Sequence, residues 1–331
     1  MIKDGIINLL KPAGMTSHDG VQLLRRLTGI KRIGHTGTLD PMAVGVLPIC
    51  IGSAARITEY LDLDYKKYRC EMQLGLETDT QDIWGTVTCD NRGEFQFNED
   101  DIKEILNSFR GRISQLPPGY SAVRVNGRRL YEYARAGEVV EIKPRDVNIK
   151  NITVVHCDPG KNRVTFDVEC SKGTYIRTIC HDAGRLLGCG AVMSCLIRTA
   201  SGVFTLENTV TIEDLSNGNP EQYLLRPDFP LVHFGKAFVK EDRAKWFVNG
   251  GHLRMSEARI IKEPEFKESD LDLDIREEYR NAYCVYLDRE EAPRKESGVF
   301  LGVAFYNFEY KKLVADKIFL GDRAVFDGNG A

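Results

Sequence analysis

The chain has 331 residues, of which 42% are hydrophobic and 28% are charged, and its formal net charge is −3. This length predicts two domains or one large one, and the composition is that of a globular protein. It excludes a fully disordered chain, a collagen and a coiled coil. No run approaches the roughly 18 apolar residues of a membrane helix, and the N-terminus does not resemble a signal peptide. We therefore expect no membrane association.

The nine cysteines are odd in number and include no Cys-x-x-Cys pair. Zinc sites usually draw on ligands paired at such close spacing. We therefore expect reduced, mostly buried thiols in a cytoplasmic protein, and no metal site.

The small net charge hides an uneven distribution of charge along the chain. Residues 103–150 carry ten Lys and Arg against five Asp and Glu, whereas residues 262–296 carry seven against twelve. The net charge alone argues against a nucleic-acid partner. The uneven distribution still allows a basic binding surface together with an acidic appendage. The six acids of 268–278 are typical of a solvated insertion.

The first hundred residues predict alternating strands and helices. Pro48 favours an edge or irregular position for its strand, and Ser17 and Gly29 can cap and end a helix. In chain order we expect a buried strand at 5–10, a helix at 17–28, a strand at 44–51, a helix at 53–61, a strand at 67–74 and a helix from Asn98 to Phe109.

The rest of the chain predicts one more strand–helix–strand unit and then a β-rich segment. We expect a strand at 163–170, a helix at 174–187, a strand at 191–199 and short strands at 283–287, 299–306 and 312–319. Proline and glycine break the pattern near 218–230, so we place a domain boundary near 225–233.

Three short segments have residue types suited to chemistry. In Gly34–Pro41 (GHTGTLDP), two glycines permit a tight loop, and the proline favours an extended backbone at Asp40. Tyr68 lies between two cations, and Arg177 lies at a strand-to-helix junction whose free amides attract anions. Each also has a structural reading: Asp40 as a turn cap, Tyr68 as a core residue and Arg177 as a surface cation.

Together these segments resemble the bacterial tRNA pseudouridine-55 synthases, which isomerise one uridine in the T-loop of tRNA. The resemblance extends from about Gly5 to Thr199. Its ordered motifs are 8–17 (NLLKPAGMTS), 34–41 (GHTGTLDP), 67–69 (KYR), 120–122 (YSA), 130–135 (LYEYAR) and 170–178 (CSKGTYIRT).

The resemblance implies a role for each matching residue. Asp40 matches the catalytic aspartate, Tyr68 the tyrosine that stacks on the target uracil, and Arg177 the arginine that pairs with the aspartate. His35 matches a histidine that wedges into the T-loop. Further substrate contacts or pocket positions are implied for Lys11, Pro12, Tyr175 and Leu196.

The residue types suit this reaction. Pseudouridine forms when the bond from N1 to C1′ breaks, the uracil turns, and C5 joins C1′. No redox change and no net hydrolysis occurs, so we expect neither cofactor nor metal. A carboxylate can attack a sugar carbon, as in retaining glycosidases, and the target base must be flipped into a closed, mostly apolar site. Attack on C1′, attack on C6 and a glycal route all stay open.

The insertion at about 124–150 is basic and aromatic. One interpretation of this insertion is a solvated helix face. The resemblance instead implies a mobile segment that closes over the T-loop. We therefore expect it to contact phosphates and to become ordered when tRNA binds. The arginines that carry this prediction are Arg124, Arg128, Arg129 and Arg135.

The last hundred residues resemble, in part, the small β-barrel RNA-binding domain called PUA, which in the family reaches toward the acceptor stem. An acidic insertion at about 262–280 departs from that pattern. The expected partner is tRNA, bound through its T-arm by a monomer that needs no other protein.

The expected fold is α+β. A pseudouridine synthase catalytic domain at 1–230 has a mixed, largely antiparallel sheet flanked by helices, and a PUA-like barrel follows at 231–331. The alternatives are a guide-RNA-dependent synthase, an RNA-binding module without catalysis, and a glycosidase. The last would need a second catalytic carboxylate that no motif supplies.

Overall fold

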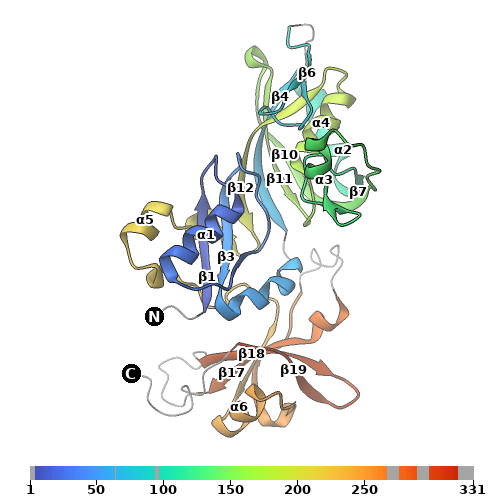
Figure 1. The fold of residues 1–331 in the computed structure, drawn as a ribbon. Coiled ribbons are helices and arrows are strands. Elements are labelled where there is room, and N and C mark those ends of the chain that lie inside the picture. The colour runs from blue at the N-terminus through green and yellow to red at the C-terminus, as the bar shows by residue number, and fades with distance from the viewer. Residues whose placement is uncertain (1–3, 64, 94–96, 267–275, 289–297, 320–331) are drawn as a thin grey trace.

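The computed structural model describes residues 4–63, 65–93, 97–266, 276–288 and 298–319. Two sheets organise these residues: nine strands between Gly5 and Thr205, and six between Gly235 and Ile318. Figure 1 shows the two sheets at opposite ends of the molecule. The fold is α+β, as predicted. Within the described ranges, no helix has the length and apolar character needed to cross a membrane.

The nine-stranded sheet is mixed and largely antiparallel, as predicted, because β3 and β12 form its one parallel pair. Its order is β1-β3-β12-β4-β11-β10-β7, with β2 paired to β3 and β13 to β12. The strands are β1 (Gly5–Lys11), β2 (Ile33–His35), β3 (Val44–Ile51), β4 (Lys66–Leu74), β7 (Gly111–Gln115), β10 (Arg145–Asp158), β11 (Arg163–Cys170), β12 (Ala191–Ser201) and β13 (Phe204–Thr205).

One face of this sheet carries the core beneath α2 (Glu99–Ser108) and α4 (Ile176–Leu186). β11 shows why: its side chains alternate with period two, so that Val164, Phe166 and Val168 all point into the core. The predicted strand and both predicted helices are confirmed here within two residues at each end.

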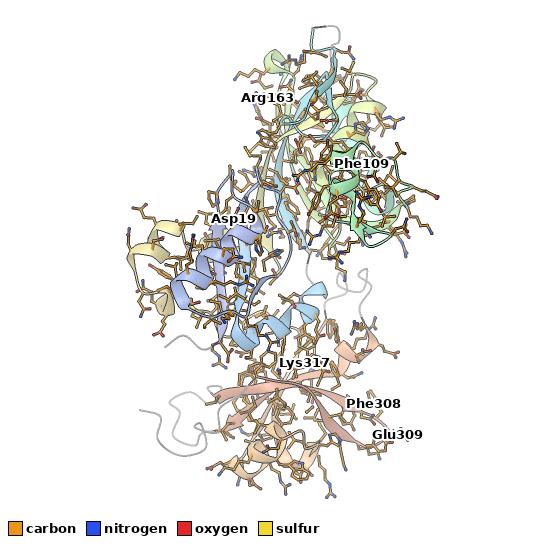
Figure 2. All side chains as sticks on the ribbon, in the orientation of Figure 1. Asp19, Phe109, Arg163, Phe308, Glu309 and Lys317 are labelled. Atoms are coloured by element: carbon orange, nitrogen blue, oxygen red, sulfur yellow. The ribbon has the colours of Figure 1, made fainter. Side chains whose placement is uncertain are left out.

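The helix α1 (Ser17–Thr28) is confirmed, but its predicted cap was wrong. Thr16 is the N-cap, and its side chain and that of Asp19 (Figure 2) form a capping box. The hydroxyl of Ser17 instead accepts from the Leu39 amide at 2.8 Å and donates to the Leu39 carbonyl at 3.0 Å. Ser17 therefore joins α1 to the loop before β3.

Of the two predictions for β3, an edge or an irregular strand, the edge position was wrong, because β3 lies between β1 on one side and both β12 and β2 on the other. β12 pairs with Val44 and Gly45, whereas β2 pairs with 49–51. Pro48 falls between these two ladders, and its carbonyl faces Thr36 on that side while Asn8 of β1 is its register partner on the other. Its missing N–H therefore interrupts neither the β12 nor the β2 ladder. An interior strand can therefore contain this proline.

The helix predicted to start at Ser53 is a 3₁₀ helix, η1 (Gly52–Leu63), that lies between the two sheets. Its Tyr60 ring packs edge-on against Phe234 and Tyr279, and its Glu59 carboxylate pairs with Lys317 (Figure 2) at 3.0 Å. One apolar cluster therefore continues from the first sheet, through η1, into the second.

The six-stranded sheet contains all the short strands predicted near the C-terminus. It is open in the described residues, so the predicted closed β-barrel is not confirmed. Its order is β15 (Leu253–Arg254), β19 (Lys312–Ile318), β18 (Gly298–Asn307), β17 (Ala282–Asp288), β14 (Gly235–Val239) and β16 (Ala258–Lys262). The helix α6 (Glu241–Val248) contacts β17 and β18. The acidic insertion lies partly outside the described residues, which omit 267–275.

The remaining elements are short. They are β5 (Leu76–Thr78), β6 (Val87–Asp90), β8 (Arg124–Val125), β9 (Arg128–Arg129), α3 (Leu130–Ala136), η2 (Pro159–Lys161), η3 (Leu206–Asn208), α5 (Ile212–Asn217), η4 (Pro220–Tyr223), η5 (Met255–Glu257) and η7 (Glu277–Asn281).

Candidate active site

Asp40 lies in the loop between β2 and β3, and backbone hydrogen bonds hold both ends of that loop. The Thr36 amide donates to the Pro48 carbonyl at 3.1 Å, and the Ala43 amide donates to the Asp40 carbonyl at 3.1 Å. Ser17 holds Leu39 from the side of α1. The Asp40 side chain is 38% exposed, so a fixed backbone presents a carboxylate that solvent can reach.

Arg177 comes from the first turn of α4, and its Nε lies 3.0 Å from Oδ2 of Asp40. The arginine side chain is only 6% exposed. The structure thus brings together two residues that are 137 positions apart in the sequence. An ion pair with a buried guanidinium fixes the direction of the carboxylate more firmly than one between two exposed groups, because the arginine cannot move freely.

Asp82 is a second carboxylate at Arg177, and the sequence did not predict it. Its Oδ2 lies 3.4 Å from Nη1 of Arg177, whose Nη1 and Nη2 also donate to the carbonyls of Thr80 and Tyr120 at 3.1 Å each. Burial raises the pKa of Asp82, and the positive charge of Arg177 opposes that rise. Two acids and two carbonyls therefore hold the guanidinium.

Tyr68 lies on β4 in an apolar cluster with Leu39, Ala43, Ile176 and Leu196. Its ring is 8% exposed. Burial raises the pKa of Tyr68 to about 12, although the positive charge of Arg198 opposes the rise. The predicted pocket residues Tyr68 and Leu196 thus share one apolar wall, and the phenol stays protonated at neutral pH.

Lys11 lies beneath the loop and not on its surface. Its ammonium donates to the carbonyls of Pro12, Met15 and Pro41 at 2.7–3.0 Å. The side chain is fully buried, and burial lowers the pKa of Lys11 to about 8 while the charge of Asp40 opposes the change. Pro12 is exposed and supplies one of these carbonyls.

His35 ends β2, immediately before the loop, and is half-buried. Burial lowers the pKa of His35, and the positive charge of Arg198 lowers it further. Among the described residues, none hydrogen-bonds to its buried Nδ1. Burial and the charge of Arg198 both favour the neutral imidazole.

Tyr175 is the residue immediately before α4, and Gln115 holds its backbone. The Gln115 side chain accepts from the Tyr175 amide at 2.7 Å and donates to its carbonyl at 2.9 Å. Gln115 is not among the residues predicted from the sequence. This pair of bonds fixes the start of the helix that carries Arg177.

The predicted basic insertion forms a short hairpin, β8–β9, followed by α3. Arg128 pairs with Glu138 at 2.9 Å and lies 4.2 Å from the centre of the Tyr133 ring, while Arg129 and Arg135 lie over Tyr131. All four predicted arginines of this segment are exposed. Figure 1 shows α3 beside α2, near β7 and β10.

In the part of the chain that the structure describes, no three His, Cys, Asp or Glu side chains are grouped so as to hold a metal ion.

Comparison with known protein families identifies the chain. The model of the TruB family pseudouridylate synthase N-terminal domain matches residues 25–176, and that of the tRNA pseudouridylate synthase B C-terminal domain matches 177–226. The chain belongs to the TruB family of pseudouridylate synthases. The family predicted from the motifs is therefore confirmed, and this TruB-family chain is a pseudouridine synthase.

Proteins named tRNA pseudouridine synthase B are similar to this TruB-family chain over most of its length. One from Alkaliphilus oremlandii is 46% identical over 87% of this chain and 91% of the relative. Another, from Heliobacterium modesticaldum, is 50% identical over 72% of this chain and 78% of the relative.

Two solved structures share the fold of this TruB-family chain. One, a Cbf5-Nop10-Gar1 complex, matches with a TM-score of 0.68 and 24% identity over 97% of this chain and 86% of the other. The other, an H/ACA RNP bound to a substrate RNA, matches with a TM-score of 0.67 and 23% identity over 96% of this chain and 85% of the other.

Proposed function

We propose that this TruB-family enzyme converts the uridine at position 55, in the T-loop of tRNA, into pseudouridine. The observation that carries the proposal is the Asp40–Arg177 ion pair of 3.0 Å beside the apolar cluster of Tyr68 and Leu196. Relatives named tRNA pseudouridine synthase B are 46–50% identical, whereas the Cbf5 complex is 24% identical. A tRNA substrate and action without a guide RNA or protein partner therefore have the stronger support.

In the proposed reaction, Asp40 is the group that reacts with the flipped nucleoside. The bond from N1 to C1′ breaks, the uracil turns, and C5 bonds to C1′. The proton on C5 is then lost, and N1 gains one, so atoms and electrons balance without an oxidant. Arg177 holds the carboxylate toward the nucleoside, since its buried guanidinium has little freedom to move.

Tyr68 and Leu196 would keep the detached uracil in place while it turns. Both belong to a buried apolar cluster, and a site that excludes water prevents the loss of a reactive intermediate. Stacking a base on an aromatic ring contributes roughly 1–3 kcal/mol, which offsets part of the cost of unstacking it from the RNA. His35, at the end of β2 beside the loop, is the proposed contact to the T-loop.

Two further regions are proposed to bind the tRNA. The arginines of 124–135 would contact phosphates of the T-arm, and the six-stranded sheet of 235–318 would serve as a PUA-like domain toward the acceptor stem. We divide the chain near residue 230 accordingly. We also propose that the enzyme acts as a cytoplasmic monomer with neither cofactor nor metal.

The test is turnover by the purified protein alone. A T-loop transcript with tritium at C5 of its uridines should release tritium, and chemical mapping should place one pseudouridine at position 55. A transcript with cytidine at that position should give neither signal. No release from the first transcript, with the tRNA demonstrably bound, would contradict the proposal.

A further inference from the structure

Three buried cations surround the loop that carries Asp40. Among the described residues, the lysines and arginines that are buried are Lys11, Arg177 and Arg198. Lys11 binds the carbonyl of Pro41, and Arg177 pairs with Asp40 itself. Burying a charge costs several kcal/mol unless partners compensate, so each of the three cations depends on the oxygens that it contacts around this loop.

Arg198, on β12, has the most unusual surroundings of the three. Its Nε donates to the carbonyl of Val46 at 2.6 Å, and its two other nitrogens donate to the carbonyls of Thr38 and Gly37 at 3.4 and 3.3 Å. In the described part of the chain, no carboxylate lies within ion-pairing distance of it. Backbone oxygens of the loop and of β3 therefore take the place of a counter-ion.

Arg198 also contacts the strand that carries Tyr68. It is the register partner of Tyr68 in the β12–β4 pair, and its positive charge opposes the rise that burial gives the pKa of Tyr68. On its other edge it pairs with Gly45, where a Cβ would lie 2.2 Å from the Arg198 carbonyl oxygen. Only glycine fits there, and the backbone of Arg198 is thus fixed from both sides.

We propose that Arg198 is a positioning residue for the isomerisation, which sets the loop that carries Asp40 relative to Tyr68. Its fork of three nitrogens spans the loop and β3, while its backbone pairs with Tyr68 on β4, and this proposal rests on the proposed function above. A lysine could not replace it, because an ammonium is a single point of charge and lacks the planar fork. The positive charge of Arg198 also lowers the pKa of His35, the proposed contact to the T-loop.

The first test compares Arg198→Lys with the wild type. Tritium release from the T-loop transcript under single-turnover conditions should slow by about 100-fold, the effect of a misplacement of about 1 Å. Affinity for the same transcript, measured in the Asp40→Asn background so that no reaction intervenes, should hardly change. The matched control is Arg163→Lys on β11 (Figure 2), whose guanidinium pairs with Glu71 at 3.2 Å; it should keep both rate and affinity.

Hydrogen exchange gives a second measurement that does not depend on activity. Amides of 36–43 should exchange faster in Arg198→Lys, while those of β11 should keep their protection. If Arg198→Lys does not fold, Arg198→Gln takes its place. A folded variant with the wild-type rate and unchanged exchange would overturn the proposal, and so would the failure of both variants to fold, because Arg198 would then be a core residue only. A wild type that releases no tritium would overturn the proposed function instead, and the exchange result would still decide the role of Arg198.

Discussion

The guanidinium of Arg177 and the carboxylate of Asp40 form an ion pair of 3.0 Å that joins the first turn of α4 to the loop before β3. The two partners differ in exposure: Arg177 is 6% exposed and Asp40 is 38% exposed. The arginine is therefore part of the interior, whereas the aspartate faces outward from it. This asymmetry suits a carboxylate that has to meet a substrate while its direction is fixed from behind.

Asp40→Asn should abolish isomerisation and leave tRNA binding intact. The amide keeps the shape of the side chain but lacks the negative charge that either attack or proton abstraction requires, so single-turnover tritium release should fall at least about 10⁴-fold, as when other enzymes lose a reacting group. Filter binding measures affinity. A variant that still forms pseudouridine would exclude Asp40 as the reacting group, whereas lost binding with residual activity would assign it to recognition.

Asp82→Asn should slow the reaction without weakening tRNA binding. Asp82 is one of the groups that orient Arg177, and its removal loosens the guanidinium at Asp40, which should cost roughly 10–100-fold in single-turnover rate. Stability should change little, because burial disfavours the ionised form that the variant removes. Asp79→Asn is the matched control, since that exposed acid bonds only within its own loop to the Thr86 amide. Equal rates for the two variants would contradict this role.

Local signals predicted most of the fold. The period-two alternation of 163–170 and the glycine after 17–28 correctly placed a strand and the end of a helix. The two errors concern the N-cap of α1 and the position of β3 in the sheet. Thr16 and Ser17 can both cap a helix, and tertiary contact with Leu39 decided between them. A proline disrupts only a strand pairing that needs its N–H. The sequence does not show that β2 and β12 pair with different parts of β3 and leave Pro48 between them.

The resemblance predicted that Asp40 pairs with Arg177, and the structure places the two side chains 3.0 Å apart. Other contacts of the site were not predictable, because they depend on folding. Asp82 lies in a polar run without a distinctive pattern, and only its contact with Arg177, 95 residues away, sets it apart. Arg198 alternates with its neighbours like any strand residue, and only the packing of β3 and β4 against β12 buries it.

Charge reversal in the insertion should weaken tRNA binding in a salt-dependent way. Each lost phosphate contact should reduce the slope of log K against log salt by about one. Arg124→Glu should show the full effect, whereas Arg128 already pairs with Glu138 at 2.9 Å, so Arg128→Glu should lose less. Single-turnover rates at saturating enzyme should stay near wild type. Binding that weakens equally at low and high salt would contradict phosphate contact.

His35 should make the stability of the protein depend on pH in mildly acidic solution. Burial lowers the pKa of His35 below its ordinary value of 6.5, so between these two values the unfolded chain binds more protons than the folded chain. The free energy of unfolding should therefore fall as pH drops below 6.5, and His35→Gln should remove this part of the fall. Urea unfolding of both proteins between pH 7.5 and 5 measures the difference, and the same substitution at exposed His156 controls for the loss of an imidazole. Curves for wild type and His35→Gln that stay parallel over that range would show that the folded protein accepts the proton at His35 as readily as the unfolded chain does.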